Sequence, residues 1–381
     1  MLDSIFKEII DKIKDYYRED IIPLHRPKFK GNEVNYVNHA IKSTFVSSIG
    51  NYVNEFELNL SKYTSINQSV ATVNGTSSLH IGLILAGVVQ NDEVITQSLT
   101  FVATANAIKY INAIPVFIDV DNENFGMNHE SLKNFLEDYG EIRNGFTYNK
   151  ITGNRIKACL PVHTFGFICE IEKIIKICKK WNIDVVEDCA EALGSFYKGK
   201  SAGKFGLISA FSFNGNKIIT AGGGGAVCSE NKTIAKNAKH LTTTAKKTHK
   251  WEYFHDQLGF NYRMPNLNAA LLCAQLERIN EIKENKKEYY NELKYCFSKI
   301  GIEIVSPRKS TDWNYWLFSL KFENKNEKNL FLKYSHNHNV LCRPVWRLMN
   351  DLPMYRDCFV FDRLNSEKIQ DTIVNIPSSE K

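Results

Sequence analysis

The sequence predicts an α/β protein in which helices cover both faces of a mostly parallel sheet. After residue 65, short β-branched runs alternate with helix-like stretches, the strand–helix–strand order that is typical of such sheets. The composition, 43% hydrophobic and 24% charged, is that of a folded globular protein. From about residue 231 the pattern changes to long charged helical stretches and then to shorter elements, which predicts a smaller C-terminal α+β domain.

The chain of 381 residues is long enough for two or three domains. Its first segment, 1–20, repeats apolar residues at helical spacing between charges, which predicts an amphipathic helix. Its mixed charges favour docking on the protein itself over the alternative of a membrane surface. A signal peptide would need an uninterrupted apolar core. We expect a large α/β domain over 21–240, followed by long helices and the small domain over 241–381.

The expected strands follow one another between helix-like stretches such as LHIGLILAGV and EIEKIIKICKKW. Ligands of parallel sheets bind beyond the carboxyl ends of the strands, so the residues that follow each strand are the candidates for a site. The strand-like runs are SVATV (69–73), DEVIT (92–96), IPVFIDV (114–120), IKACLPV (156–162), DVVEDC (184–189) and LISAFSF (207–213).

Charge and cysteine content exclude several classes of protein. The net charge of +6 is spread along the chain, which suits anionic small molecules better than nucleic acid. The nine cysteines contain no CxxC pair, so we expect reduced thiols in a cytoplasmic protein, without a metal site or disulfides. No uncharged apolar run approaches the length of a membrane span, so no membrane partner is expected.

The turn NGTSS, which follows the first expected strand, predicts a phosphate-binding site. It places Gly75, Thr76 and Ser77 at a helix N-terminus, where free backbone N–H groups and hydroxyls bind phosphate. Ser212, near the end of a later strand, offers a further hydroxyl. An ordinary turn with a helix cap is the alternative, because the same residue types serve there.

Asp188 and Lys217 supply the remaining parts of a cofactor site. Asp188 ends a strand, where a carboxylate either caps a helix or pairs with a cationic ring nitrogen. Lys217 lies between AFSF and a glycine run, and such a lysine taken alone is more often a solvated loop residue. Together with the phosphate site, the two form the set of groups that holds pyridoxal phosphate. A nicotinamide site is disfavoured because no GxGxxG opens a helix.

Five stretches carry a resemblance to a known family: NGTSSLHIGL, TFVATANAIKYINAIPVFIDVD, LPVHTFGF, VVEDCAEALGSFYKGKSAGKFGLISAFSFNGNKIITAGGGGAV and LGFNYRMPNLNAALLCAQLERI. In this order they resemble the pyridoxal-phosphate sugar aminotransferases of the DegT/DnrJ/StrS family. The resemblance extends from about residue 22 to the C-terminus. It implies an aspartate-aminotransferase-like fold (fold type I), with a mostly parallel seven-stranded sheet in the large domain and a smaller C-terminal α+β domain.

The resemblance implies a role for each polar residue above. Lys217 would bind the cofactor covalently and move a proton between the cofactor carbon and the sugar carbon. Asp188 would pair with the ring nitrogen. Phe101 would stack on the ring, although without the resemblance it is a plain core aromatic. The phosphate would be held by Gly75, Thr76, Ser77 and Ser212.

Five further residues are site candidates through the same resemblance. Glu191 lies where relatives often carry Gln or His near the cofactor hydroxyl. Asn261 matches a residue that reaches the cofactor phosphate of the neighbouring subunit, which implies a homodimer with shared active sites. His163 either lines the substrate site or is a satisfied core histidine. Arg263 and Arg343 bind the donor carboxylate or a diphosphate, or form structural salt bridges.

Within the family, IPLHRPKFKGNE, STFVSSIGNYVNEFE and the C-terminal stretch look most like the LegC-like branch of legionaminic-acid biosynthesis. That branch moves an amino group from L-glutamate to a nucleotide-linked 4-keto-6-deoxy-N-acetylhexosamine. UDP and GDP both remain open as the nucleotide. Sugar contacts are expected from Ser47, Ser48 and Gly50. Closure over the diphosphate is expected from the segment that carries Lys246, Lys247, His249 and Lys250, with a solvated basic loop as the alternative.

Three other functions agree less well with the sequence. Keto-sugar dehydratases resemble these aminotransferases but carry histidine in place of the lysine, so Lys217 argues against them. A non-catalytic nucleotide-sugar-binding scaffold would be expected to lose Lys217 or Asp188, and both are present. A nucleic-acid-binding protein would need a recognition motif, which the lysine-rich stretch near residue 285 lacks.

Overall fold

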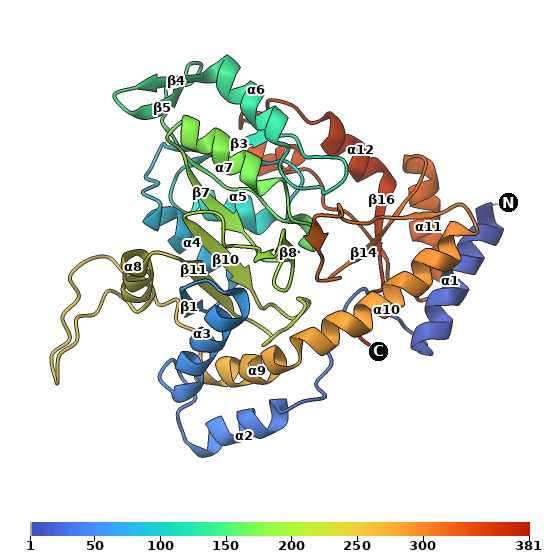
Figure 1. Ribbon diagram of the computed structural model, residues 1–381, viewed down its shortest axis with the longest axis horizontal. Coiled ribbons are helices and arrows are strands. Elements are labelled where there is room, and N and C mark those ends of the chain that lie inside the picture. Colours follow the sequence, from blue (N-terminus) through green and yellow to red (C-terminus); the bar gives the residue numbers. More distant parts are fainter. Residues whose placement is uncertain (1) are drawn as a thin grey trace.

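The computed structural model describes residues 2–381, and a seven-stranded sheet forms its centre (Figure 1). Strand β11 runs antiparallel to both of its neighbours, and the remaining pairs are parallel. The predicted mostly parallel seven-stranded sheet is therefore confirmed. The strand order is β1 (Gln68–Thr72), β11 (Gly225–Ser229), β10 (Ile208–Ser212), β7 (Asp184–Asp188), β6 (Ile156–Cys159), β2 (Glu93–Gln97) and β3 (Ile114–Ile118).

Helices cover both faces of this sheet because successive strand residues point to opposite sides. In β7, Val185 belongs to one apolar core cluster and Val186 to the other. The cluster around Val186 contains residues of α4 (Gly75–Leu85), α5 (Val102–Lys109) and α8 (Lys232–Thr242). The cluster around Val185 contains residues of α3 (Asn51–Thr64), α6 (His129–Tyr139), α7 (Ile171–Lys180) and α9 (Asn266–Glu277).

A four-stranded antiparallel sheet forms the smaller C-terminal part. Its strands are β12 (Glu303–Ile304), β14 (Phe318–Lys321), β16 (Ile373–Ile376) and β15 (Arg343–Pro344), with α11 (Lys325–Asn337) and α12 (Leu364–Thr372) beside them. The long helix α10 (Ile279–Ser298) leads into it from α9. The shorter elements are α2 (Glu33–Lys42), β4 (Gly140–Arg143), β5 (Phe146–Asn149), η1 (Thr164–Gly166), β8 (Phe196–Tyr197), β9 (Lys200–Ser201), β13 (Thr311–Asp312), η2 (Met349–Asp351) and η3 (Pro353–Tyr355).

The N-terminal helix α1 (Leu2–Tyr17) packs on this smaller part (Figure 1). Its apolar face is buried, and the ring of Phe6 lies 5.4 Å from that of Phe331 in α11. Burial of this face explains the helical spacing of its apolar residues. Within residues 2–381, no helix combines the length and the apolar character that a membrane crossing requires.

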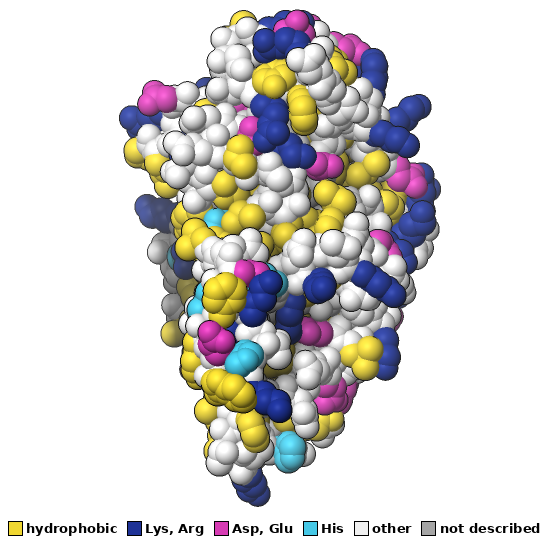
Figure 2. Space-filling model, turned by 90° about the vertical axis from the view of Figure 1, so that its left-hand side faces the viewer, with side chains coloured by type: hydrophobic (Ala, Val, Ile, Leu, Met, Phe, Trp, Pro, Cys, Tyr) yellow, Lys and Arg dark blue, Asp and Glu magenta, His cyan; other side chains and the backbone are white. Residues whose placement is uncertain are grey.

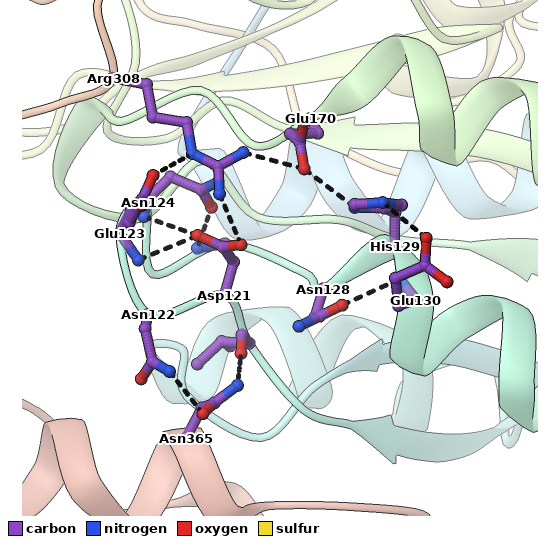
Figure 3. Close-up of polar contacts among 12 residues, drawn as sticks. Asp121, Asn122, Glu123, Asn124, Asn128, His129, Glu130, Glu170, Arg308 and Asn365 are labelled. Carbon is purple, nitrogen blue, oxygen red and sulfur yellow. Dashed lines mark hydrogen bonds and ion pairs between the residues drawn. The ribbon is translucent and has the colours of Figure 1, made fainter.

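Arg308 ties the C-terminal part to the large sheet domain. Its guanidinium lies 2.8 Å from Asp121 Oδ2, 2.8 Å from Glu170 Oε2 and 2.5 Å from Glu123 Oε2, and Figure 3 shows the three carboxylates around it. Glu170 also accepts from His129 Nδ1 at 3.0 Å. Three carboxylates on one planar guanidinium fix the segment after residue 305, which leads to the cavity described below.

An arm leaves the body after α8 and returns to it before α9 (Figure 1). Bridges pair Thr243 with Asn261 and Lys246 with His255, and residues 246–258 are all exposed. The exposed residues include Trp251 at 78% and Leu258 at 84%. Figure 2 looks onto the side from which the arm projects and shows hydrophobic, basic and histidine side chains gathered on its lower half. Large apolar side chains in water are unfavourable, so the arm has the character of an interface.

Lys286, on the buried side of α10, predicts a pH-dependent stability. Burial lowers the pKa of Lys286 to about 7, against partial opposition from Glu380, and Nζ donates to the carbonyl oxygens of Trp316 and Ser378. Between about pH 7 and the unfolded-state pKa of about 10.4, the unfolded chain holds the proton that the folded chain lacks. The free energy of unfolding should therefore rise with pH in this window by up to about 1.4 kcal/mol per pH unit from this group.

Urea unfolding of the wild type and of Lys286→Met at pH 7, 8 and 9 measures this effect, because other titrations cancel in the difference. We expect the stability of the wild type relative to Lys286→Met to increase from pH 7 to pH 9. A difference that does not change with pH would contradict a neutral buried amine.

Candidate active site

A cavity of about 400 Å³ lies beyond the carboxyl ends of the central strands. Its wall brings together seven of the predicted site residues: Gly75, Thr76, Phe101, Asp188, Glu191, Ser212 and Lys217. The other residues of the wall are Asn74, Leu79, Thr100, Ala103, Thr104, Val162, Ala190, Asn214, Asn216, Trp316 and Trp346. The location agrees with the rule that ligands of parallel sheets bind at this edge.

Lys217 lies in the turn after β10 and points into this cavity. Its N–H donates to Asn214 O at 3.0 Å, which closes the turn. Its Nζ lies 3.5 Å from Glu191 Oε1 and 4.3 Å from the ring centroid of Trp316, and the side chain is only 12% exposed. A solvated loop lysine would keep its amine in water, so the burial and the contacts of Nζ exclude that alternative.

Asp188 is the last residue of β7 and is buried. Its Oδ2 accepts a hydrogen bond from Thr104 Oγ1 at 2.8 Å, and its Oδ1 accepts one from the backbone N–H of Ala190 at 3.1 Å. Burial raises the pKa of Asp188, while these two hydrogen bonds and the charge of Lys217 oppose the rise. A buried carboxylate with two donors holds its orientation, which suits a hydrogen bond to a cationic ring nitrogen.

The candidate phosphate-binding end of the cavity is the start of α4. Asn74 caps the helix, because its Oδ1 accepts the backbone N–H of Ser77 at 2.8 Å. This differs from the expectation for Ser77, whose N–H is used within the protein. The Ser77 side chain is also absent from the cavity wall as far as residues 2–381 define it. In the described chain, the helix-start N–H groups that remain for an anion are those of Gly75 and Thr76.

Gly75 is required because the helix start lies against the end of β10. A Cβ atom at Gly75 would lie 2.7 Å from Ser212 Cβ, closer than side-chain atoms approach one another. This contact places the Ser212 hydroxyl beside the helix N-terminus. The two N–H groups, the hydroxyls of Thr76 and Ser212, and the dipole of α4 therefore form one anion site.

Glu191 lies between Lys217 and the backbone of η1. Its Oε2 accepts the N–H of Phe165 at 2.7 Å, while its Oε1 faces Lys217. Burial raises the pKa of Glu191, and the charge of Lys217 opposes the rise. The carboxylate is thus held in place on the cavity wall.

His163 lies in the core, away from the cavity wall, so the structure favours the alternative of a satisfied core histidine. Its ring is fully buried, with Nε2 at 3.0 Å from Glu187 Oε2 and Nδ1 at 3.4 Å from the N–H of Cys169. Glu187 also accepts three backbone N–H groups from the loop 203–206. Cys189 completes a buried group of potential metal ligands with His163 and Glu187, but hydrogen bonds already use the Glu187 oxygens.

The remaining predicted substrate residues lie outside the cavity wall formed by residues 2–381. The loop with Ser47, Ser48 and Gly50 docks on the start of α9, where Asn266 binds the carbonyls of Ser47 and Phe45. On the arm and beside it, Lys246, Lys247 and Asn261 are exposed. Arg343 is exposed on β15, and Arg263 is half-buried beside β1.

Two tryptophans of the cavity wall were missed by the sequence reasoning. Trp316 and Trp346 both come from the C-terminal part, and Trp346 lies 5.0 Å from Phe165 and 6.5 Å from Phe101 between ring centroids. Tryptophans in such stretches are usually core residues, so no local signal marks them. Asn216 was also missed, although its position next to Lys217 could have pointed to it.

The fold and the site define a pyridoxal-phosphate-dependent aminotransferase. The chain belongs to the DegT/DnrJ/EryC1/StrS aminotransferase family, whose model matches residues 27–381. It is a pyridoxal-phosphate-dependent sugar aminotransferase of class EC 2.6.1.-.

Known proteins support the family membership. The chain is 36% identical over 336 residues to a GDP-perosamine synthase of Escherichia coli O157:H7, covering 88% of this chain and 87% of the relative. It is 33% identical over 337 residues to the GDP-perosamine synthase of Vibrio cholerae, with 88% and 87% covered. These relatives support membership of the family. They do not specifically support the LegC-like branch, so the branch within the family stays open.

Two solved structures share the fold. The aminotransferase TlmJ from Streptoalloteichus hindustanus superposes with a TM-score of 0.85 at 21% identity, covering 94% of this chain and 93% of that one. The PseC aminotransferase of Helicobacter pylori superposes with a TM-score of 0.84 at 22% identity, with the same coverage. The predicted aminotransferase fold is confirmed.

The cavity fits pyridoxal phosphate. The anion site at Gly75 and Thr76, the buried carboxylate of Asp188 and the amine of Lys217 match its phosphate, ring nitrogen and aldehyde, and Phe101 at the mouth offers a ring face. When bound, pyridoxal phosphate supplies a carbon that accepts and returns an amino group and a ring that withdraws electrons. Lys217 Nζ would hold and move the proton during the transfer, and Asp188 would keep the ring nitrogen protonated.

Proposed function

We propose that this aminotransferase moves the amino group of L-glutamate to the 4-keto carbon of a nucleotide-linked 4-keto-6-deoxyhexose or its N-acetylhexosamine counterpart. The product would be a 4-amino-4,6-dideoxy sugar for surface-glycan or nonulosonic-acid biosynthesis. The observation that carries the proposal is the placement of Lys217 Nζ beside Glu191 in the same cavity as Asp188 and the α4 N-terminus.

The identity of the nucleotide and sugar rests on two supports that point differently. The names of the GDP-perosamine synthases favour a GDP-linked acceptor. The resemblance of segments 22–33 and 43–57 to the LegC-like branch favours an N-acetylated acceptor with UDP or GDP. Both acceptors share the 4-keto-6-deoxy ring, which is the part that reacts.

Lys217 also separates this proposal from a keto-sugar dehydratase. A dehydratase of this fold carries histidine at the lysine position, and a scaffold would not need to keep Lys217 and Asp188 buried in one cavity. Neither alternative would form a 4-amino sugar, so product analysis separates all three.

The test has two stages. Holoenzyme is first mixed with L-glutamate alone, and we expect one equivalent of 2-oxoglutarate per site. Each keto-sugar, GDP-linked, UDP-linked and N-acetylated, is then added, and the product is examined by mass spectrometry and NMR. Amination at C4 of one of them is the expected result. Loss of water at C3, or release of no 2-oxoglutarate, would contradict the proposal.

We also propose that two copies of the chain share their active sites. The exposed apolar arm and the exposed Asn261 at its base support this proposal. Within residues 2–381, neither the arm nor Asn261 is part of the cavity wall of its own chain. A second copy would cover the arm and bring Asn261 and the lysines to its cavity. This arrangement would explain why so many predicted substrate residues lie outside the cavity wall.

Mixed dimers test the shared site. Lys217→Ala and Asn261→Asp subunits, each inactive or strongly impaired alone, are denatured, mixed and refolded. Shared sites would restore up to about a quarter of wild-type activity, since half of the dimers are mixed and one of their two sites is intact. No recovery in a verified mixed dimer would contradict the shared site.

A further inference from the structure

Trp316 contacts the amine of Lys217 from the C-terminal part of the chain. The amine nitrogen lies 4.3 Å from the centroid of the indole ring, within the range of a cation–π interaction, and 3.5 Å from Glu191 Oε1. We propose that Trp316 is a positioning residue of the transamination, whose indole face holds the Lys217 amine beside Glu191 whenever that amine is free. The inference rests on the role proposed for Lys217.

The indole also fixes the backbone that carries the lysine. Its Nε1–H donates to the carbonyl oxygen of Asn216 at 2.7 Å, directly before Lys217. One ring thus contacts the lysine amine through its face and, through its N–H, the backbone carbonyl of the residue before the lysine. Rotating the ring away from Nζ would break the bond to Asn216, so the two contacts are made together.

Trp316 is itself held rigidly. The residue is 2% exposed, and its backbone N–H donates to Asn314 Oδ1 at 3.1 Å. Its backbone carbonyl oxygen accepts from Lys286 Nζ at 3.2 Å and from Ser378 Oγ at 3.1 Å. Asn314 in turn donates to the carbonyls of Glu191 and Leu193. The ring therefore has a fixed place relative to Glu191, and the amine between them is positioned by rigid neighbours.

The contact has an electrostatic consequence. The negative face of an indole favours a positively charged amine, as do the carboxylates of Glu191 and Asp188, whereas the charge of Lys217 also acts on the buried ring of His25. Removing the indole face removes one of these stabilising contacts. The amine should then be held less tightly, react more readily with an acylating reagent and be placed less well for proton transfer.

The experiment uses Trp316→Leu, which removes the ring, and Trp316→Phe, which keeps a ring face but loses the bond to Asn216. In cofactor-free protein, acylation of Lys217 by a small amine-reactive ester is followed by mass spectrometry from pH 6 to 10. In the holoenzyme, the pH midpoint of the visible cofactor band and kcat and KM for glutamate are measured. Trp346→Leu is the matched control, because Trp346 lines the same cavity without a cation–π contact to Lys217 within residues 2–381.

For Trp316→Leu we expect acylation of Lys217 at a fixed pH to rise roughly threefold to tenfold, a shift of the band midpoint to lower pH, and a fall in kcat that exceeds the change in KM. Trp316→Phe should keep acylation near the wild-type rate and lose kcat. Trp346→Leu should change neither the acylation rate nor the midpoint. If Trp316→Leu does not fold, Trp316→Met replaces it with the same expectation.

Two results would overturn the inference. The first is a Trp316→Leu protein in which the acylation rate of Lys217 and the pH midpoint of the cofactor band equal those of the wild type. The second is an equal rise of the acylation rate in Trp346→Leu, which would mean that opening the cavity is sufficient to expose the amine. A visible band that survives in Lys217→Ala would instead overturn the lysine assignment and this inference together. If Lys217→Ala loses the band but Trp316→Leu keeps the wild-type acylation rate and midpoint, the lysine assignment stands and only the inference about Trp316 is overturned.

Discussion

Lys217→Ala should abolish the visible absorption band of the bound cofactor and reduce turnover by at least about 10⁴-fold, because one side chain supplies both the covalent link and the proton transfer. The fold should be retained, since the Lys217 side chain points into a cavity, where its amine contacts Glu191 and Trp316. The measurements are the absorption spectrum of the reconstituted protein, circular dichroism and amino-sugar formation.

A lysine outside the cavity provides the control for this variant. Lys200 is exposed on β9, and Lys200→Ala should keep both the band and the turnover. An amine added in solution, such as ethylamine, should restore part of the activity of Lys217→Ala, because the cavity keeps its shape. A Lys217→Ala protein with a normal band and turnover would show that another amine reacts.

Asp188→Asn should retain the fold and lose roughly 10²-fold or more in turnover. Asparagine has nearly the same shape and can still accept one of the two hydrogen bonds, from Thr104 or from Ala190. It has no negative charge to hold a proton on the ring nitrogen, so the bound ring withdraws electrons less well. The cofactor should still bind, because the anion site at Gly75 does not depend on Asp188.

The matched control lies at the other end of the same strand. Asp184 begins β7 and pairs with Lys157 outside the cavity, so Asp184→Asn removes the same charge from the same strand. It should leave kcat near the wild-type value, because this partly buried pair lies outside the cavity. Near-normal turnover in Asp188→Asn, measured with saturating cofactor, would show that this carboxylate is not the partner of the ring nitrogen.

Local sequence patterns predicted six of the seven strands of the central sheet and most residues of the candidate cofactor site, whereas the count of seven strands came from the family resemblance. The runs that end at Asp188 and Ser212 are β-branched or apolar, and the turn at Gly75 opens a helix, so each part is encoded within a few residues. Carboxyl ends of neighbouring parallel strands meet at one edge, which brings parts distant in sequence into one cavity. The assignment of roles to Phe101, Glu191 and Asn261 needed the family resemblance.

Side-chain direction limited other assignments. His163 follows β6 and lies near the site in sequence, yet its ring points into the core toward Glu187. Ser77 is at the helix start, but the cap formed by Asn74 uses its N–H. Both outcomes depend on a rotation of one side chain, for which the pattern of residue types has no signal.

The sequence by itself thus determined six strands of the sheet, the residues at their carboxyl ends and the candidate lysine and aspartate, because these follow from short-range periodicity and chain order. Only the tertiary structure decided what surrounds Lys217. Trp316 and Trp346 reach the cavity because the C-terminal part folds back on the large sheet, held by contacts such as those of Arg308. Packing between segments distant in sequence depends on the shapes of both contacting surfaces, and each surface is formed by residues from several stretches of the sequence.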